Sequence, residues 1–175
     1  MSLAGGLVRS LTPAERAALS PGLAAALQAA GAFPRIRDAA SSLARIAAVW
    51  RGAVPVLTLG DIIHWPGAPA DASRHPAAMA LLQHELQHVL DYAEGRLTWW
   101  GYGLDPRNWT YRLPPAHAWT WSRLGAEQRA VLAERLWRAQ QARDSRAAAA
   151  CARVLPWAKL AEQPGPGQRS PVAGA

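Results

Sequence analysis

The sequence is poor in cysteine, because Cys151 is the only one among 175 residues. A lone cysteine excludes a disulfide within the chain and a structural zinc site built from several thiolates. Any metal site must therefore draw its ligands from histidine and carboxylate side chains.

Long apolar runs are also missing. The first twenty residues contain Pro13, Glu15 and Arg16 where a secretory signal would have a continuous apolar stretch. No segment approaches the ~20 apolar residues of a membrane-spanning helix. We expect a soluble cytoplasmic chain without a membrane span, although export by a dedicated machine would leave no recognisable mark.

Lysine is nearly absent, since Lys159 stands alone and the net charge of +7 comes almost wholly from arginine. A basic chain can bind nucleic acid. The arginines are scattered, however, without the dense runs and interleaved aromatic residues that are typical of a recognition module. We interpret the charge as solvated surface, and nucleic acid is not an expected partner.

What is abundant is alanine within a half-hydrophobic composition, which favours helices. The length suits one domain with a sizeable core. From Pro156 onward, Pro-Gly-Pro-Gly and Ser-Pro are typical of disorder. We expect one domain over residues 1–155 and a disordered tail over 156–175.

Caps and periodicity predict the elements before residue 75. A capping box at Thr12–Glu15 predicts a helix start, and Ser20-Pro21 predicts a second helix that ends near Gly31. Further expected elements are a short strand over 35–38 and a helix over 41–50. Two β-branched runs around Gly60-Asp61 predict a hairpin within 54–65.

Three further segments follow. Pro76 should open a helix that Gly95 ends, and residues 97–122 should form an ordered, irregular segment. The tryptophans of that segment are expected to complete the core. A last long helix is predicted over 123–153.

The most informative stretch is His84-Glu85-Leu86-Gln87-His88. Residues i and i+4 share a helix face, so both imidazoles can bind one metal ion while Glu85 projects near the open position. With 5 His and 6 Glu in the chain, chance would give roughly 0.005 such matches. The pattern predicts a zinc site, against the alternative of a satisfied polar cluster in a core helix.

Catalytic zinc is usually held by three protein ligands, so a third must be found. Glu94 could serve only if the helix broke near Asp91, where no glycine stands. Glu127, early in the last predicted helix, is the best candidate, and Gly125 beside it would allow close approach. Glu134 is the reserve, although it sits near arginines that suit a surface pair.

These residues carry a resemblance to a known family. The stretch Leu57–Ile63, followed by Leu81–Val89, resembles the metallopeptidase-like core domain associated with extracellular contractile injection systems. Leu11–Glu15 and Gly125–Ala130 resemble the bacterial Vgr-related proteins, a sibling group. The resemblance covers residues 11–140. It implies a zinc peptidase of the minimal gluzincin type that works beside secretion or injection components.

The family's Glu-Gln motif falls on Glu127 and Gln128. Asp91-Tyr92 stands where relatives carry glutamine, and Val131 replaces the aspartate that thermolysin-type enzymes have four residues after the third ligand. The residue that orients the zinc histidines is therefore unassigned, with Asp91 as a weak candidate.

In a catalytic site, zinc lowers the pKa of its water, and Glu85 takes the water proton and passes it to the leaving amine. Tyr111 and His117 are candidate donors to the oxyanion. The strand within Asp61–Trp65 could align a peptide by strand addition.

We therefore expect an α+β, zincin-like fold with a small hairpin or sheet before the zinc helix. The expected function is a zinc-dependent metallopeptidase acting on a protein or peptide. The alternative is a weakly active or inactive adaptor module with the same fold.

Overall fold

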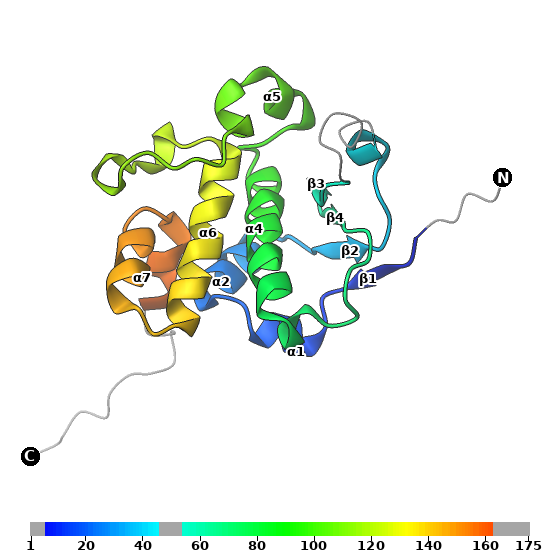
Figure 1. Ribbon diagram of the computed structural model, residues 1–175, viewed down its shortest axis with the longest axis horizontal. Helices are drawn as coiled ribbons and strands as arrows, with labels where there is room; N and C mark the ends of the chain where they lie inside the picture. Colours follow the sequence, from blue (N-terminus) through cyan, green and yellow to red (C-terminus); the bar gives the residue numbers. More distant parts are fainter. Residues whose placement is uncertain (1–5, 46–53, 163–175) are drawn as a thin grey trace, which may run out of the picture.

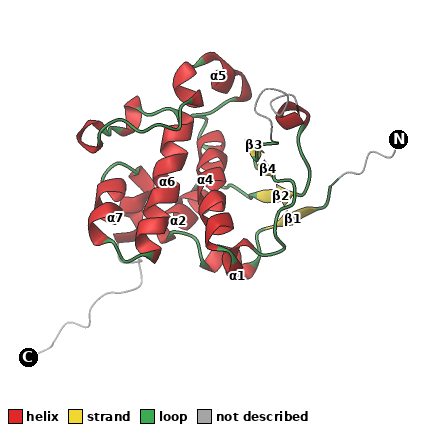
Figure 2. Cartoon of the chain, in the orientation of Figure 1, coloured by secondary structure: helices red, strands yellow, loops and turns green. Residues whose placement is uncertain are grey.

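The chain forms a layer of helices with a small sheet along one side, an α+β arrangement (Figures 1 and 2). The computed structural model describes residues 6–45 and 54–162. The strands are β1 (Val8–Ser10), β2 (Arg35–Arg37), β3 (Leu57–Leu59) and β4 (Ile62–His64). The α-helices are α1 (Pro13–Ala17), α2 (Pro21–Ala29), α4 (Pro76–Ala93), α5 (Trp99–Leu104), α6 (Ala126–Gln141) and α7 (Ser145–Ala152). The 3-10 turns are η1 (Ala72–Arg74), η2 (Pro106–Trp109), η3 (Ala116–Ala118), η4 (Trp121–Arg123) and η5 (Pro156–Glu162).

The sheet has the order β1-β2-β4-β3, with β2 and β4 parallel and the other two pairs antiparallel. The predicted hairpin is confirmed as β3 and β4, and Gly60 takes a positive φ of 62° at its turn. Among the described strands, β3 forms one edge and β4 lies inside. The prediction that the strand within Asp61–Trp65 aligns a peptide is therefore wrong, because β4 already pairs with β2 on one side and with β3 on the other.

Helix α4 lies between the sheet and α6, so it is buried on both sides (Figure 1). Pro76 opens it and Gly95, at φ 70°, follows its end, as predicted. Apolar side chains at helical spacing fill one side of it: Met79, Leu82, Leu86, Val89 and Leu90. At 25 cal/mol per Å² of buried apolar surface, such side chains supply about 1.5–3 kcal/mol each before entropy is subtracted.

Several polar residues of α4 are buried too, and most of their polar atoms have partners, although Gln83 Nε2 has none among the described residues. Gln83 accepts from the Ser20 N–H, and Trp157 Nε1 donates to Gln87 Oε1. Gln87 in turn donates to Asp91 Oδ1 at 3.0 Å. These bonds remove most of the cost of burying polar groups in the helical layer.

The long helix predicted over 123–153 is wrong. Helix α6 ends at Gln141, Arg143 takes φ 55°, and α7 begins at Ser145. The Asp144 side chain accepts from the N–H of Ala147 and so caps the new helix. This turn lets α7 fold back against α6, which a single straight helix could not do.

The disordered tail was expected from residue 156, but residues 156–162 are ordered. Pro156–Glu162 form η5, and Trp157 is 4% exposed where η5 meets α2. Gly22 permits this contact, because a Cβ there would lie 2.4 Å from the Trp157 carbonyl oxygen. The rest of the expected tail, residues 163–175, lies outside the described residues. Residues 42–45 are helical, and the remainder of the helix expected over 41–50 also lies outside them.

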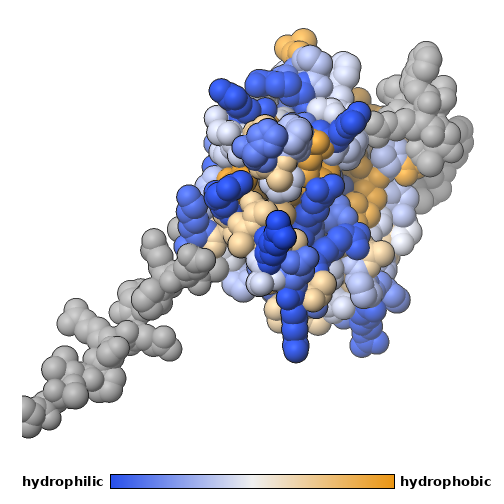
Figure 3. All heavy atoms as spheres, turned by 60° about the vertical axis from the view of Figure 1, so that its left-hand side comes forward, coloured by the Kyte–Doolittle hydropathy of each residue, from blue (hydrophilic) through white to orange (hydrophobic). Residues whose placement is uncertain are grey.

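The irregular segment over 97–122 is confirmed as short turns around α5, but its tryptophans are not all core residues. Trp119 and Trp121 pack against the core, whereas Trp100 and Trp109 are 65% and 55% exposed. Figure 3 shows hydrophilic residues spread over the face around α7 with apolar ones between them. None of the helices in the described ranges combines the length and apolar character that a membrane crossing requires.

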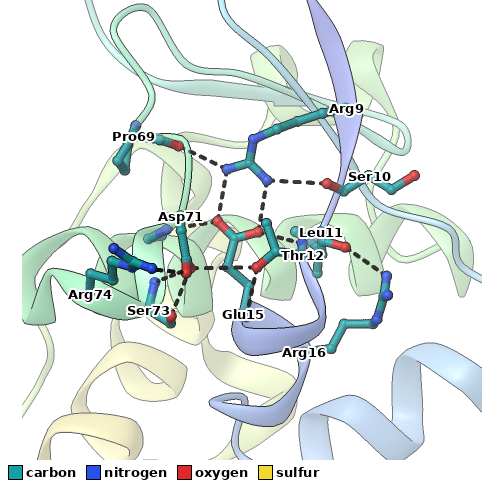
Figure 4. Close-up of polar contacts among 11 residues, drawn as sticks. Arg9, Ser10, Leu11, Thr12, Glu15, Arg16, Pro69, Asp71, Ser73 and Arg74 are labelled. Atoms are coloured by element: carbon teal, nitrogen blue, oxygen red, sulfur yellow. Dashed lines mark hydrogen bonds and ion pairs between the residues drawn. The ribbon is translucent and has the colours of Figure 1, made fainter.

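A buried carboxylate fixes the N-terminal segment to the loop before α4 (Figure 4). Glu15 is fully buried and accepts from both terminal nitrogens of Arg9 at 2.8 Å. It also accepts from the N–H groups of Thr12 and Ala72, so the predicted capping box is confirmed. Burial acts to raise the pKa of Glu15, but these donors outweigh it and the pKa lies below the usual value.

We predict that Glu15→Gln lowers the free energy of unfolding by roughly 1–3 kcal/mol at neutral pH, because the donors lose a charged acceptor. Folding lowers the pKa of Glu15 from 4.5, so its contribution is complete above that pH and is lost as pH falls through the folded value. The difference between wild type and variant should therefore shrink in acid.

Urea unfolding at several pH values measures this. Asp61→Asn is the control, because its pair with Arg35 is about half exposed on both sides and contributes little. Equal losses for the two variants would show that Glu15 is not a special support.

Candidate metal centre

Two imidazoles and one carboxylate meet between α4 and α6. His84 and His88 lie one turn apart on α4, and each directs Nε2 toward Glu127 of α6. Glu127 Oε2 lies 3.0 Å from His84 Nε2 and 3.5 Å from His88 Nε2. All three side chains are buried, and their candidate ligand atoms lie within 4.8 Å of one another. This group can hold a metal ion.

The spacing suits a small divalent cation. Bonds of 2.0–2.2 Å in a tetrahedron separate the ligand atoms by about 3.4 Å, close to the 3.0 and 3.5 Å between Glu127 Oε2 and the two imidazole nitrogens. Two imidazole nitrogens and a carboxylate oxygen also form one of the donor sets of catalytic zinc. The residues present therefore fit a zinc ion. Glu127, the predicted third ligand, lies beside both histidines.

The start of α6 carries Glu127 to this position through several anchors. The Gln128 side chain accepts from the Gly125 N–H and donates to the Arg112 carbonyl at 2.8 Å. The backbone of Arg107 lies so close to Gly125 that only glycine fits there. A Cβ at this position would lie 2.0 Å from the Arg107 carbonyl oxygen. Gly125 thus makes room for the segment before α6, and not for α4 as the sequence suggested.

Charge holds the group together. Burial acts to lower the pKa of His84, but Glu127 and Glu134 outweigh it and raise that pKa to about 9. Burial acts to raise the pKa of Glu127, whereas its hydrogen bonds to His84, His88 and Tyr102 bring that pKa well below the usual value. A proton shared between a histidine and a carboxylate occupies the place that a cation would take, so metal and proton compete there.

A partner for the other nitrogen of His84 also comes from α6. Glu134 Oε2 lies 3.7 Å from His84 Nδ1, and Glu134 is also paired with Arg138. Glu134 is therefore not the third ligand but stands where it can orient His84. Asp91 does not do so, because its carboxylate accepts from Gln87 and Arg129, and no hydrogen bond joins it to His84 or His88.

His88 differs from His84 in this respect. Its Nδ1 is buried and has no hydrogen-bond partner among the described residues. Nδ1 of His84 thus faces a carboxylate on α6, whereas Nδ1 of His88 has no such partner among the described residues.

Glu85 lies beside the cluster without being part of it. Its carboxylate accepts a hydrogen bond of 2.7 Å from the hydroxyl of Thr58 on β3, and both side chains are 5% exposed. Thr58 shares one face of the sheet with Ile63 and Ile36, which pair in register and point into the core. The edge strand thus fixes the orientation of Glu85.

A cavity of about 390 Å³ opens above these groups. His84, Glu85, His88 and Glu127 lie among its lining residues. The rest of its wall is largely apolar and aromatic, from the 43–44 segment, the 55–59 strand region, α4 and the 97–111 segment. A polar centre within an apolar cavity is the usual form of a small-molecule or peptide-binding site.

The other predicted site residues divide. Tyr111 lines the cavity, and its ring is stacked on that of His84 with centroids 6.0 Å apart. His117 is exposed on η3 and is not among the lining residues, so its proposed role is not supported by its position. Glu94 is exposed at the end of α4 and pairs with Arg96.

Sequence reasoning missed Tyr102. Its hydroxyl donates to Glu127 Oε1 at 2.6 Å from α5, 25 residues earlier in the chain. No spacing rule connects a residue in an irregular segment to a carboxylate on a later helix.

Comparison with known proteins yields no support for a family: no family model, characterised protein or solved structure matches the chain. The resemblance to injection-system metallopeptidases therefore stays a hypothesis.

We predict about one zinc ion per purified chain. His84→Ala and His88→Ala should each lose it, because two remaining ligands hold zinc poorly. His75→Ala is the matched control, since His75 is exposed before α4 and makes no capping hydrogen bond. Elemental analysis after dialysis measures the ratio. Equal zinc in wild type and all three variants would place the metal elsewhere.

Proposed function

We propose that this protein is a zinc-dependent metallopeptidase with a zincin-like site. The observation that carries the proposal is the convergence of His84, His88 and Glu127 on one point, with the carboxylate of Glu85 in the same cavity. A structural zinc site is usually closed by four protein ligands, whereas this group offers three, and the nearby carboxylate of Glu85 is not one of them.

Zinc is the metal we propose because two imidazoles and one carboxylate are a donor set of catalytic zinc. A bound zinc ion supplies Lewis acidity, which makes a water molecule more acidic and a carbonyl group more electrophilic. The remaining work falls to side chains of the chain itself.

Glu85 is the proposed general base. Its carboxylate faces the cavity and is oriented by the Thr58 hydroxyl, so it can accept a proton from water at a fixed place. It then returns the proton to the nitrogen of the leaving amine. Proton transfer of this kind contributes ~10²–10⁴ in rate.

Tyr111 is the candidate donor to the developing oxyanion, because it lines the cavity beside His84. The substrate is proposed to be a peptide, for two reasons. The cavity wall is mostly apolar, and β3, which lines it, is an edge strand of the sheet. Within residues 6–45 and 54–162 no strand pairs with its outer side, which can therefore pair with an extended chain.

The proposal extends, on the resemblance alone, to a component of a contractile injection or secretion system. The alternative is an adaptor that has the same fold but no turnover. An intact Glu85 held at the cavity favours the enzyme, because metal binding alone does not require that residue.

We predict that Glu85→Gln keeps zinc and thermal stability but lowers peptide hydrolysis by ~10² or more. The amide preserves the shape and can still accept from Thr58, but it cannot take a proton. Mass spectrometry of a peptide library rich in bulky apolar residues measures cleavage. Glu94→Gln is the control, because Glu94 is exposed directly after the same helix and lies outside the cavity lining.

Wild-type protein loaded with zinc that cleaves nothing in the library, yet binds a partner with or without Glu85, would favour the adaptor. Equal cleavage by wild type and Glu85→Gln would instead show that another group is the base.

A further inference from the structure

The two oxygens of Glu127 have different partners. Oε2 faces both imidazoles, at 3.0 and 3.5 Å, whereas Oε1 accepts a 2.6 Å hydrogen bond from the hydroxyl of Tyr102. A hydroxyl–carboxylate bond of this length is a strong, charge-assisted one. Glu127 is therefore held in one rotational orientation by a residue from α5.

The position of Tyr102 is fixed to the start of α6. Asn108, which is 8% exposed, donates to the carbonyl of Gly101 on one side and accepts from the N–H of Ala126 on the other. Trp109 Nε1 donates to the carbonyl of Tyr102 itself at 3.0 Å. Because Ala126 directly precedes Glu127, the same anchor sets the distance between the hydroxyl and the carboxylate.

We propose that Tyr102 is a positioning residue that restricts Glu127 to one ligand oxygen and thereby keeps a coordination position open. The inference rests on the metal site of the proposed function. A carboxylate can bind a metal through one oxygen or through both. Binding through both, together with two imidazoles, would supply four protein ligand atoms, so that a water or substrate atom could enter only as a fifth ligand.

An open coordination position would face the cavity that the proposed catalytic residues line. Tyr102 lines the same cavity as Glu85 and Tyr111, and its hydroxyl engages Oε1 of Glu127 while Oε2 lies near the two histidines. Without the hydroxyl, Oε1 loses this partner and is free to turn toward the cation.

The test uses metal alone and needs no substrate. Tyr102→Phe removes the hydroxyl and keeps the ring. Tyr92→Phe is the matched control, because Tyr92 lines the same cavity from α4 but makes no hydrogen bond to Glu127. The visible spectrum of each cobalt-loaded protein reports the coordination number, since four-coordinate Co²⁺ absorbs more strongly than five-coordinate Co²⁺. Competition with a chelator gives the zinc dissociation constant, and thermal unfolding of the metal-free proteins checks the fold.

We expect Tyr102→Phe to weaken the cobalt absorption, because a fifth ligand atom joins the metal. The zinc dissociation constant should rise by ~10–100-fold, because Glu127 is no longer held in its binding orientation before the metal arrives, while Tyr92→Phe matches wild type. A spectrum and a dissociation constant for Tyr102→Phe equal to those of wild type would overturn the inference and leave the peptidase proposal intact. If Tyr102→Phe changes the cobalt spectrum and the zinc dissociation constant as expected, but the wild-type protein cleaves no peptide, the inference is supported and the peptidase proposal is overturned. Wild-type protein that binds neither metal would overturn both.

Discussion

The arrangement of the molecule depends on one contact, the approach of the Glu127 carboxylate to the imidazoles of His84 and His88. It joins the centre of α4 to the first turn of α6, and α4 is the helix against which the sheet also packs. For the contact to form, α6 must start at one place. Asn108, Gly125 and Gln128 fix that start through bonds and a close approach to the segment before it. The irregular stretch between α4 and α6 is thus the part that brings the three side chains together.

Burying such a polar group inside a mostly apolar layer has a cost, which its partners offset. Thr58 of β3 holds Glu85, Tyr102 of α5 holds Glu127, and Glu134 of α6 faces the rear nitrogen of His84. Each support comes from a different element, so no single helix could position the group alone. Polar groups fixed in advance in a water-poor site are effective in catalysis because they need little reorganisation during the reaction.

The sequence predicted the parts of the site that follow a local rule. His84, Glu85 and His88 follow from helical spacing, and Glu127 was expected from its place at the start of the next helix. Tyr102 could not be predicted, since its contact joins distant segments without a spacing rule. The break of the last predicted helix was missed because Arg143 adopts a positive φ that its residue type disfavours. The early end assigned to the domain failed because composition alone cannot show that Trp157 is buried where η5 packs against α2.

The central claim is that two histidines and one glutamate hold a single zinc ion with a position left open. X-ray absorption at the zinc edge of the loaded protein tests it most directly. The account predicts a first shell of nitrogen and oxygen only, at ~2.0–2.2 Å, with the outer-shell scattering of two imidazoles. A sulfur shell at ~2.3 Å from Cys151, or an all-oxygen shell without imidazole scattering, would contradict it.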